Sequence, residues 1–216
     1  MNRSQRPTGR SYNRFTAKMA LDLAAPHTWP ASIVPVAIAV ALAIATGHQI
    51  SATMTIALLG ICILMQSSVN TFNDYYDFVK GTDSSDDDVD PTDAVLIYNN
   101  VNPTCALVFA IGLLVSAFVL GGYVIYHAGL IPLAIGAIGA VFVVLYSAGK
   151  TPISYLPLGE AVSGIVMGGL IPLACYQVLT GLLTPLAVLW AVPEILGIGL
   201  IMFTNNTCDI EKDALA

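Results

Sequence analysis

Charged residues are scarce in this 216-residue chain. Lys, Arg, Asp and Glu make up 10% of it, and apolar residues make up 56%. About a quarter of the residues of a soluble domain are charged. This composition excludes an ordinary soluble domain and indicates a membrane protein. We therefore expect a lipid bilayer as its surroundings and no nucleic acid as its partner.

Cysteine is also rare, and its positions exclude further classes. The chain has four cysteines, Cys62, Cys105, Cys175 and Cys208, and no two of them are close in sequence. Zinc sites and dithiol redox motifs need close pairs. We interpret the four as small apolar residues that pack inside or at the edge of helices.

Six long apolar segments are present instead. Each has about the twenty residues that a helix needs to cross a bilayer. They lie at residues 29–47, 51–72, 104–126, 129–148, 158–179 and 184–206. The sequence therefore predicts an all-α integral membrane protein with about six transmembrane helices. A basic arm at 1–20 precedes one transmembrane domain at 21–216, in which polar loops occupy about 73–103 and 147–158.

The basic residues orient the predicted helices. With the N-terminus inside, all eight fall on the cytoplasmic side, which satisfies the positive-inside rule. They are Arg3, Arg6, Arg10, Arg14, Lys18, Lys80, Lys150 and Lys212. We expect a multi-pass protein of the cytoplasmic membrane whose N-terminus faces the cytoplasm.

Two polar motifs close apolar segments on that same predicted side. The first contains Asn70, Asn73, Asp74 and Asp77, whose spacings of three and four place them on one helix face. The second contains Asn205, Asn206, Asp209 and Asp213. Hard cations such as Mg²⁺ prefer carboxylate oxygens and leave part of their shell to substrate phosphates. The motifs therefore predict a Mg²⁺ site formed by Asp74, Asp77, Asp209 and Asp213.

An acidic site at a membrane surface suits a substrate that has both a negative head and an apolar tail. A prenyl diphosphate has both, and Mg²⁺ would stabilise the charge that develops as its C–O bond breaks. The allylic cation left behind needs dry walls and π faces. The candidates for those walls are Phe72, Tyr75, Tyr76, Phe142, Tyr146 and Tyr155.

Three stretches together resemble the UbiA superfamily of intramembrane prenyltransferases. They are the first motif with its continuation through Lys80-Gly81-x-Asp83, the segment Tyr146 to Glu160, and the second motif. The closest resemblance is to the 1,4-dihydroxy-2-naphthoate prenyltransferases of menaquinone synthesis. The segment Pro26 to Pro35 also looks like that branch.

The resemblance implies a fold, a reaction and roles for particular residues. It implies a bundle of about nine membrane helices, of which this chain supplies six, so the chain looks truncated at its C-terminus and we expect it to transfer slowly alone. The reaction would join a polyprenyl group to an aromatic acceptor such as 1,4-dihydroxy-2-naphthoate. Tyr146 would lie near the reacting carbon. The residues implied to bind substrate are Asn70, Asn73, Lys80, Lys150, Asn205 and Asn206.

Two positions depart from the superfamily pattern. The superfamily commonly has Arg before the first proline of helix one, where this chain has Ala25, and Arg after the first motif, where this chain has Asp93. An absent Arg loses bidentate phosphate binding, and an added Asp repels phosphate. The chain either uses other cations or binds diphosphate less well.

The role of one intramembrane acid stays open, and so do three alternatives to the proposed function. Glu194 falls in the sixth apolar segment, where an ionised carboxylate is costly and must face the protein interior or be protonated. An ion or metal transporter that uses Asp74, Asp77, Glu194 and Asp209 is the alternative from a different class. The others are another UbiA-type aromatic prenyltransferase and an inactive truncated relative.

Overall fold

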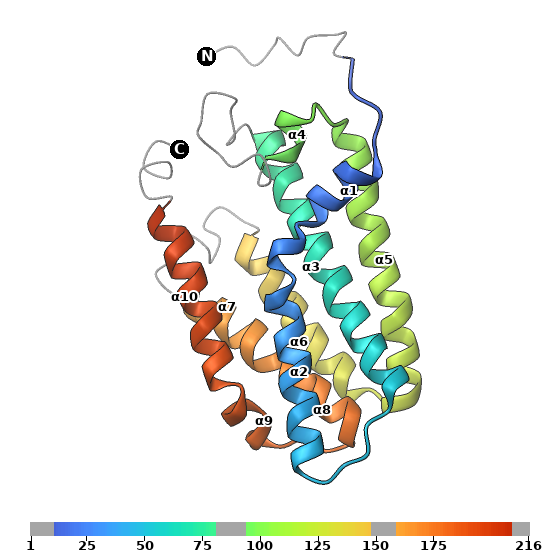
Figure 1. The fold of residues 1–216 in the computed structure, drawn as a ribbon, viewed down its shortest axis with the longest axis vertical. Helices are drawn as coiled ribbons and strands as arrows, with labels where there is room; N and C mark the ends of the chain where they lie inside the picture. The colour runs from blue at the N-terminus through green and yellow to red at the C-terminus, as the bar shows by residue number, and fades with distance from the viewer. Residues whose placement is uncertain (1–10, 81–93, 148–158, 209–216) are drawn as a thin grey trace. The chain divides into compact units, whose positions relative to one another are not determined.

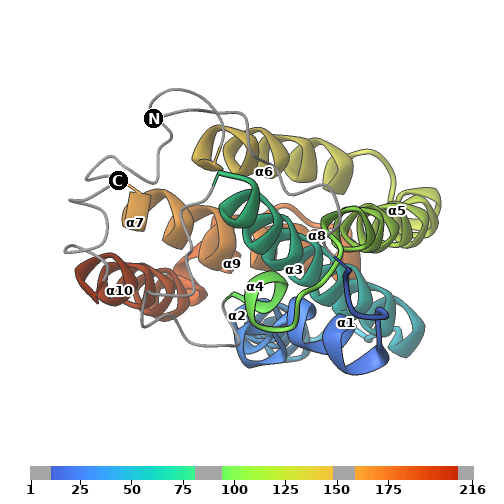
Figure 2. The same ribbon diagram turned by 90° about the horizontal axis from the view of Figure 1, so that it is seen from above.

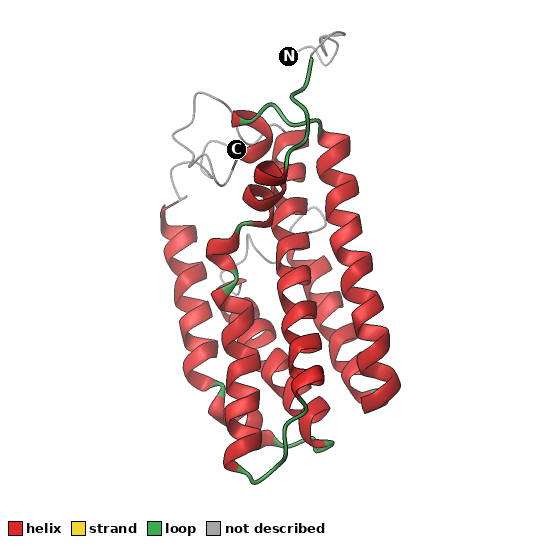
Figure 3. Ribbon diagram, turned by 45° about the vertical axis from the view of Figure 1, so that its right-hand side comes forward, coloured by secondary structure: helices red, strands yellow, loops and turns green. Residues whose placement is uncertain are grey.

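The computed structural model describes residues 11–80, 94–147 and 159–208. Every regular element in those ranges is helical, which confirms the all-α prediction (Figure 3). Three helical stretches in them are long and apolar enough to cross a membrane: Ala52–Val79, Pro103–Ala128 and Gly159–Thr180. A fourth span results if the neighbouring helices Ala17–Thr28 and Pro30–Ala45 form one crossing. Val192–Thr204 is a shorter apolar helix.

Twelve helical elements follow one another in the described ranges, and Figure 1 labels the α-helices. They are α1 (Ala17–Ala24), η1 (Pro26–Thr28), α2 (Pro30–Ala45), α3 (Ala52–Lys80), α4 (Val95–Tyr98), α5 (Pro103–Ala128), α6 (Ile131–Ser147), α7 (Gly159–Ser163), the π-helical segment η3 (Gly164–Leu170), α8 (Ile171–Thr180), α9 (Pro185–Trp190) and α10 (Val192–Cys208). Each of the six predicted apolar segments thus becomes helical.

Two compact units divide these helices. The first contains Met1–Pro26 and Ser67–Leu113, and the second contains His27–Gln66 and Leu114–Ala216. The long helices α3 and α5 therefore contribute one part to each unit. The first unit carries the first Asp motif.

The core of the first unit forms around α4. Leu23, Val95, Leu96, Val101 and Ala106 are buried together, and side chains from α1, α3 and α5 pack against them. Thr16 begins α1 as its N-cap, because its hydroxyl accepts a hydrogen bond from the Met19 amide at 3.2 Å. These contacts gather the N-terminal segment, the end of α3 and the start of α5.

The core of the second unit lies between α2, α3 and α8. It buries Val36, Leu42, Leu58, Cys175 and Tyr176 among smaller side chains. α2 packs chiefly against α8, and α10 packs against η3 and α7. Figure 2 shows α7 beside α10. Cys175 lies in this core and Cys62 packs against it, although 113 positions separate the two in sequence. Cys62 and Cys175 thus pack with apolar neighbours, as predicted.

Small residues let α10 approach η3 closely. A Cβ placed on Gly164 would lie 2.5 Å from the Ile195 carbonyl oxygen, and one on Gly168 would lie 2.6 Å from the Ile195 nitrogen. Real Cβ atoms do not come so near to backbone atoms. The Gly164-x-x-x-Gly168 spacing therefore serves helix packing, as such spacings do in membrane proteins.

The last two apolar segments are interrupted near their prolines. The sixth segment breaks at Ala191 into α9 and α10, and Pro193 follows the break. The fifth segment changes from the π-helical η3 to α8 just before Pro172. A proline cannot donate an amide hydrogen bond and collides with the preceding turn, which explains both positions.

Candidate functional site

The first polar motif lies within a helix, not in a loop. α3 continues to Lys80 and so includes the first eight residues of the stretch 73–103, which its polarity assigned to a loop. The apolar residues Tyr75 and Phe78 of this stretch pack on the first unit's core, so the helix has a face to bury. The predicted helical spacing of Asn70, Asp74 and Asp77 is therefore present.

Asp74 is the most enclosed acid of the motif. Its side chain is only 7% exposed. The carboxylate accepts two backbone hydrogen bonds from the start of α4: Oδ2 from the Val95 amide at 2.9 Å and Oδ1 from the Leu96 amide at 3.3 Å. Hydrogen bonds from amides to a carboxylate are stronger than those between neutral groups. They fix both the orientation of Asp74 and the start of α4.

Asn70 and Thr71 join the same part of α3 to the end of α1. The Asn70 side-chain amide donates to the Ala24 carbonyl at 3.2 Å, and the Thr71 hydroxyl donates to the Leu23 carbonyl at 3.1 Å. These carbonyls lie at a helix end, where backbone acceptors lack intrahelical donors. The amide of Asn70 therefore has a structural contact in addition to its predicted role in substrate binding.

Ala25, where the superfamily commonly has Arg, is buried at the end of α1. It is 8% exposed and has a φ of 47°. Its amide donates to the Asp22 carbonyl at 3.0 Å, which closes the helix. An Ala at this position contributes no cation to the motif.

The other residues of the first motif are more accessible. Asn73 is exposed, and Asp77 is half-buried. The rings of Phe72 and Tyr76 stack with centroids 6.4 Å apart, and Tyr75 meets Tyr76 edge-on at 5.4 Å. Tyr75 also packs on the apolar core, so it has a structural contact. Tyr76 is 50% exposed and offers a π face at the surface of the unit.

Several predicted site residues cannot be placed. Asp209, Asp213, Lys150 and Tyr155 lie outside the described residues. α10 contains Asn205 and Asn206, α6 contains Tyr146 and α3 ends at Lys80, but the description does not extend to these four side chains. In the part that the structure describes, no group of three or more His, Cys, Asp and Glu side chains gathers as a metal site would require. The joining of the two motifs stays a prediction.

Glu194 belongs to neither motif in the sequence. The helix break places it in the first turn of α10, not in the middle of a continuous helix. It is half-buried. The backbone carbonyl carbon of Glu194 would lie 2.9 Å from a Cβ on Gly168, so this turn belongs to the close packing of η3 and α10.

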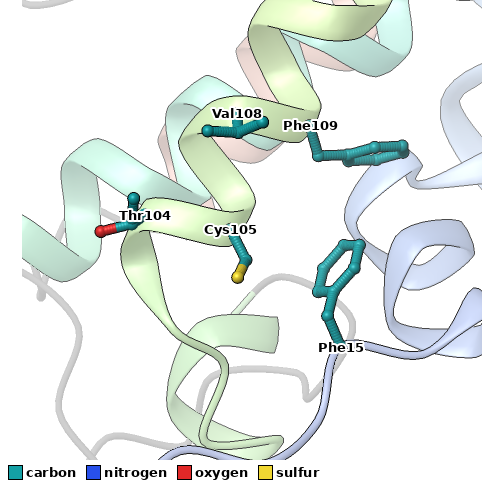
Figure 4. A pocket seen from close by; sticks show the side chains of 5 residues that line it. All are labelled: Phe15, Thr104, Cys105, Val108 and Phe109. Atoms are coloured by element: carbon teal, nitrogen blue, oxygen red, sulfur yellow. The ribbon is translucent and has the colours of Figure 1, made fainter.

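One apolar pocket opens elsewhere in the first unit. It has a volume of about 380 Å³ and is lined by Phe15, Thr104, Cys105, Val108 and Phe109. Figure 4 shows the Phe15 ring reaching from the N-terminal segment toward the start of α5. None of the predicted site residues lines it, so it adds nothing to the polar site.

The first motif and most of the helices around it lie within a region that matches a known family. The model of the UbiA prenyltransferase family matches residues 32–216. The chain belongs to this family. UbiA proteins are integral membrane proteins, in agreement with the apolar helices described above. The resemblance found in the motifs is thereby confirmed.

Curated relatives of this UbiA chain come from bacteria and animals. The 1,4-dihydroxy-2-naphthoate octaprenyltransferase of Bacillus subtilis is 31% identical over 192 residues, which cover 89% of this chain and 61% of that protein. UbiA prenyltransferase domain-containing protein 1 of Danio rerio is 31% identical over 92% of this chain and 62% of its own length. The human protein of that name is 28% identical over 94% of the chain and 60% of its own. The chain thus spans about three fifths of the relatives' length.

The amides of Val95 and Leu96 are contacts of the site that sequence reasoning missed. Backbone groups leave no trace in residue type, and Asp74 is 21 positions away from Val95. One signal was present: Val95-Leu96-Ile97-Tyr98 is an apolar run inside a polar loop. Such a run indicates a segment that docks on a core.

Proposed function

We propose that this UbiA chain takes part in the Mg²⁺-dependent transfer of a polyprenyl group from a polyprenyl diphosphate to an aromatic acceptor, 1,4-dihydroxy-2-naphthoate. The observation that carries the proposal is the acidic face of α3, in a chain that belongs to the UbiA family. A similar protein of Bacillus subtilis is named for this acceptor. Family membership favours this reaction over ion transport.

The described carboxylates fit a hard cation. Asp74 and Asp77 lie one turn apart on α3 and offer only oxygen donors, which Mg²⁺ prefers. Both oxygens of Asp74 accept backbone amides, and a carboxylate with its four or so acceptor positions can coordinate a metal while it accepts two amides. When bound, Mg²⁺ supplies charge neutralisation to the departing diphosphate. Asp209 and Asp213 are proposed to complete the ligand set.

The protein's own residues would hold the substrate and shield it from water. Asn70, Asn73, Asn205 and Asn206 offer amides to diphosphate oxygens, and Lys80 and Lys150 offer cations. Tyr146, together with the exposed ring of Tyr76, would face the allylic carbon and stabilise positive charge through their π systems.

The test measures binding and transfer separately in lipid nanodiscs. Radiolabelled polyprenyl diphosphates of several lengths are titrated with and without Mg²⁺, and prenylated products are then sought with 1,4-dihydroxy-2-naphthoate. Mg²⁺-dependent binding is expected, as is product above the protein-free background. Absence of Mg²⁺-dependent binding at every length would contradict the proposal.

The choice of acceptor is tested in the same assay. A second reaction contains 4-hydroxybenzoate, another phenolic acid, in place of 1,4-dihydroxy-2-naphthoate. The Danio and Bacillus proteins are each 31% identical to this chain, and the name of the Danio protein does not specify an acceptor. Product from 4-hydroxybenzoate alone would keep the reaction class and replace the acceptor.

A further inference from the structure

The two oxygens of Asp74 and the first two amides of α4 form a closed pair of contacts. Val95 is 0% exposed and Leu96 is 1% exposed, so both amides lie in the apolar core of the first unit. Asp74 itself is 7% exposed. Figure 1 shows α4 beside the end of α3 that carries the motif.

These amides depend on Asp74 for a partner. The first amides of a helix have no acceptor within it. The later amides of this segment are bonded locally: those of Ile97 and Tyr98 both donate to the Ala94 carbonyl at 3.1 Å. Separation from Asp74 would leave the Val95 and Leu96 amides without that acceptor in a buried place, which is unfavourable. Docking of α4 and orientation of Asp74 are therefore interdependent.

We propose that the backbone amides of Val95 and Leu96 are positioning groups for Asp74, so that docking of α4 and binding of Mg²⁺–diphosphate at the α3 motif stabilise each other. The proposal rests on the proposed function, because that function makes Asp74 a metal ligand. It assigns to α4 a task that neither the family match nor the motif contains.

The sign of the coupling follows from the acceptor capacity of the carboxylate. A carboxylate has about four acceptor positions, so it can hold two amides and a cation at the same time. Displacement would instead leave two buried amides unpaired. The docked α4 keeps Asp74 in one orientation before the metal arrives. By thermodynamic linkage, metal and diphosphate must then hold α4 more firmly in return.

Hydrogen exchange tests whether Asp74 fastens α4. The 216-residue chain in nanodiscs is compared with Asp74→Ala, which removes both acceptors, and Asp74→Asn, which keeps one acceptor oxygen. Exchange in peptides that cover residues 94–101 should rise at least about tenfold in Asp74→Ala and less in Asp74→Asn. Asn73→Ala is the control, because Asn73 is the exposed neighbour of Asp74 on α3.

Binding of inorganic pyrophosphate tests the coupling without altering any metal ligand. Val95→Pro removes the amide that donates at 2.9 Å, and proline is tolerated at the first position of a helix. Val95→Ala is its matched control, since it also loses side-chain volume but keeps the amide. Calorimetry with Mg²⁺ and pyrophosphate should show affinity at least about tenfold weaker for Val95→Pro than for Val95→Ala.

The unaltered chain supplies a third measurement, which stands even where Val95→Pro does not fold. Mg²⁺ with pyrophosphate should slow hydrogen exchange at residues 94–101, and Mg²⁺ alone should slow it less.

Each outcome bears on a separate part of the proposal. Unchanged exchange in Asp74→Ala would show that Asp74 does not hold α4 in place. Faster exchange on adding pyrophosphate would show that binding and docking of α4 oppose each other. Equal affinities of folded Val95→Pro and Val95→Ala would overturn the coupling. If the unaltered chain binds polyprenyl diphosphate but no pyrophosphate, the coupling fails and the proposed function stands, whereas binding without transfer counts against the function alone.

Discussion

Gly168 of η3 lies directly against Ile195 of α10. A Cβ on Gly168 would fall 2.6 Å from the Ile195 nitrogen and 2.7 Å from its Cα. Both obstacles are backbone atoms, which cannot rotate away as the end of a side chain can. The approach of these helices therefore depends on the missing side chain at position 168.

Gly168→Ala is expected to destabilise the second unit. The added methyl group must push α10 away, and overpacking of this kind costs about 1–3 kcal/mol. The free energy of unfolding is measured by titration with a denaturing detergent in mixed micelles. Gly197→Ala on α10 is the control, because a Cβ there would meet nothing within 4 Å. Equal stability of the two variants would show that α10 does not pack on η3 as described.

Loss of the Asp74 carboxylate is expected to abolish most turnover. Removing one group that stabilises the transition-state charge in an oxyanion hole costs about 10²–10³ in kcat. Asp74→Asn is expected to lower product formation by a similar order, roughly 10²–10³, and to raise the Mg²⁺ requirement. Initial rates are measured across a range of Mg²⁺ concentrations. Asp22→Asn is the control, since it removes a carboxylate of α1 that lies outside both motifs. An unchanged rate and Mg²⁺ dependence in Asp74→Asn would remove Asp74 from the catalytic set.

The hydroxyl of Tyr176 is expected to stabilise the second unit modestly. Tyr176 is 2% exposed, and its hydroxyl lies 3.2 Å from the Thr46 hydroxyl. The Thr46 hydroxyl also donates to the Leu42 carbonyl at 2.8 Å, so Tyr176 joins a hydrogen-bonded group at the end of α2. Tyr176→Phe should lower the free energy of unfolding by about 0.5–1.5 kcal/mol. Tyr126→Phe, at an 85% exposed position, should leave the free energy of unfolding unchanged. An equal loss of stability in both variants would argue against the Thr46 contact.

The predicted orientation is tested by labelling single cysteines in a chain whose four native cysteines have been replaced. Because all eight basic residues are assigned to the cytoplasmic side, Cys at position 80 should react from the cytoplasm and Cys at position 127 from the opposite side. Inside-out and right-side-out vesicles are compared with a membrane-impermeant maleimide. Labelling of position 80 only from the outside would reverse the topology.

Residue composition and spacing determined the class of the molecule. With 10% charged residues and apolar runs near twenty residues long, the chain can satisfy its backbone in a bilayer only through helices or a closed barrel, and its segments have the length of helices. The spacing of Asn70, Asp74 and Asp77 required one helix face, and α3 provides it. These features are local, so they can be inferred from neighbours along the chain.

Only long-range packing determined which residues contact one another between the helices. The contact of Asp74 with the Val95 and Leu96 amides joins backbone to side chain over more than twenty positions, and no residue type encodes an amide donor. The extension of α3 to Lys80 depends on the core against which Tyr75 and Phe78 pack, not on the polarity of its residues. The Gly164 and Gly168 pair was visible in the sequence, but its partner Ile195 was not. The sequence indicates which secondary structure each segment can form. The tertiary structure determines which polar groups are buried, and a buried polar group needs a hydrogen-bond partner, which can lie far away in the sequence.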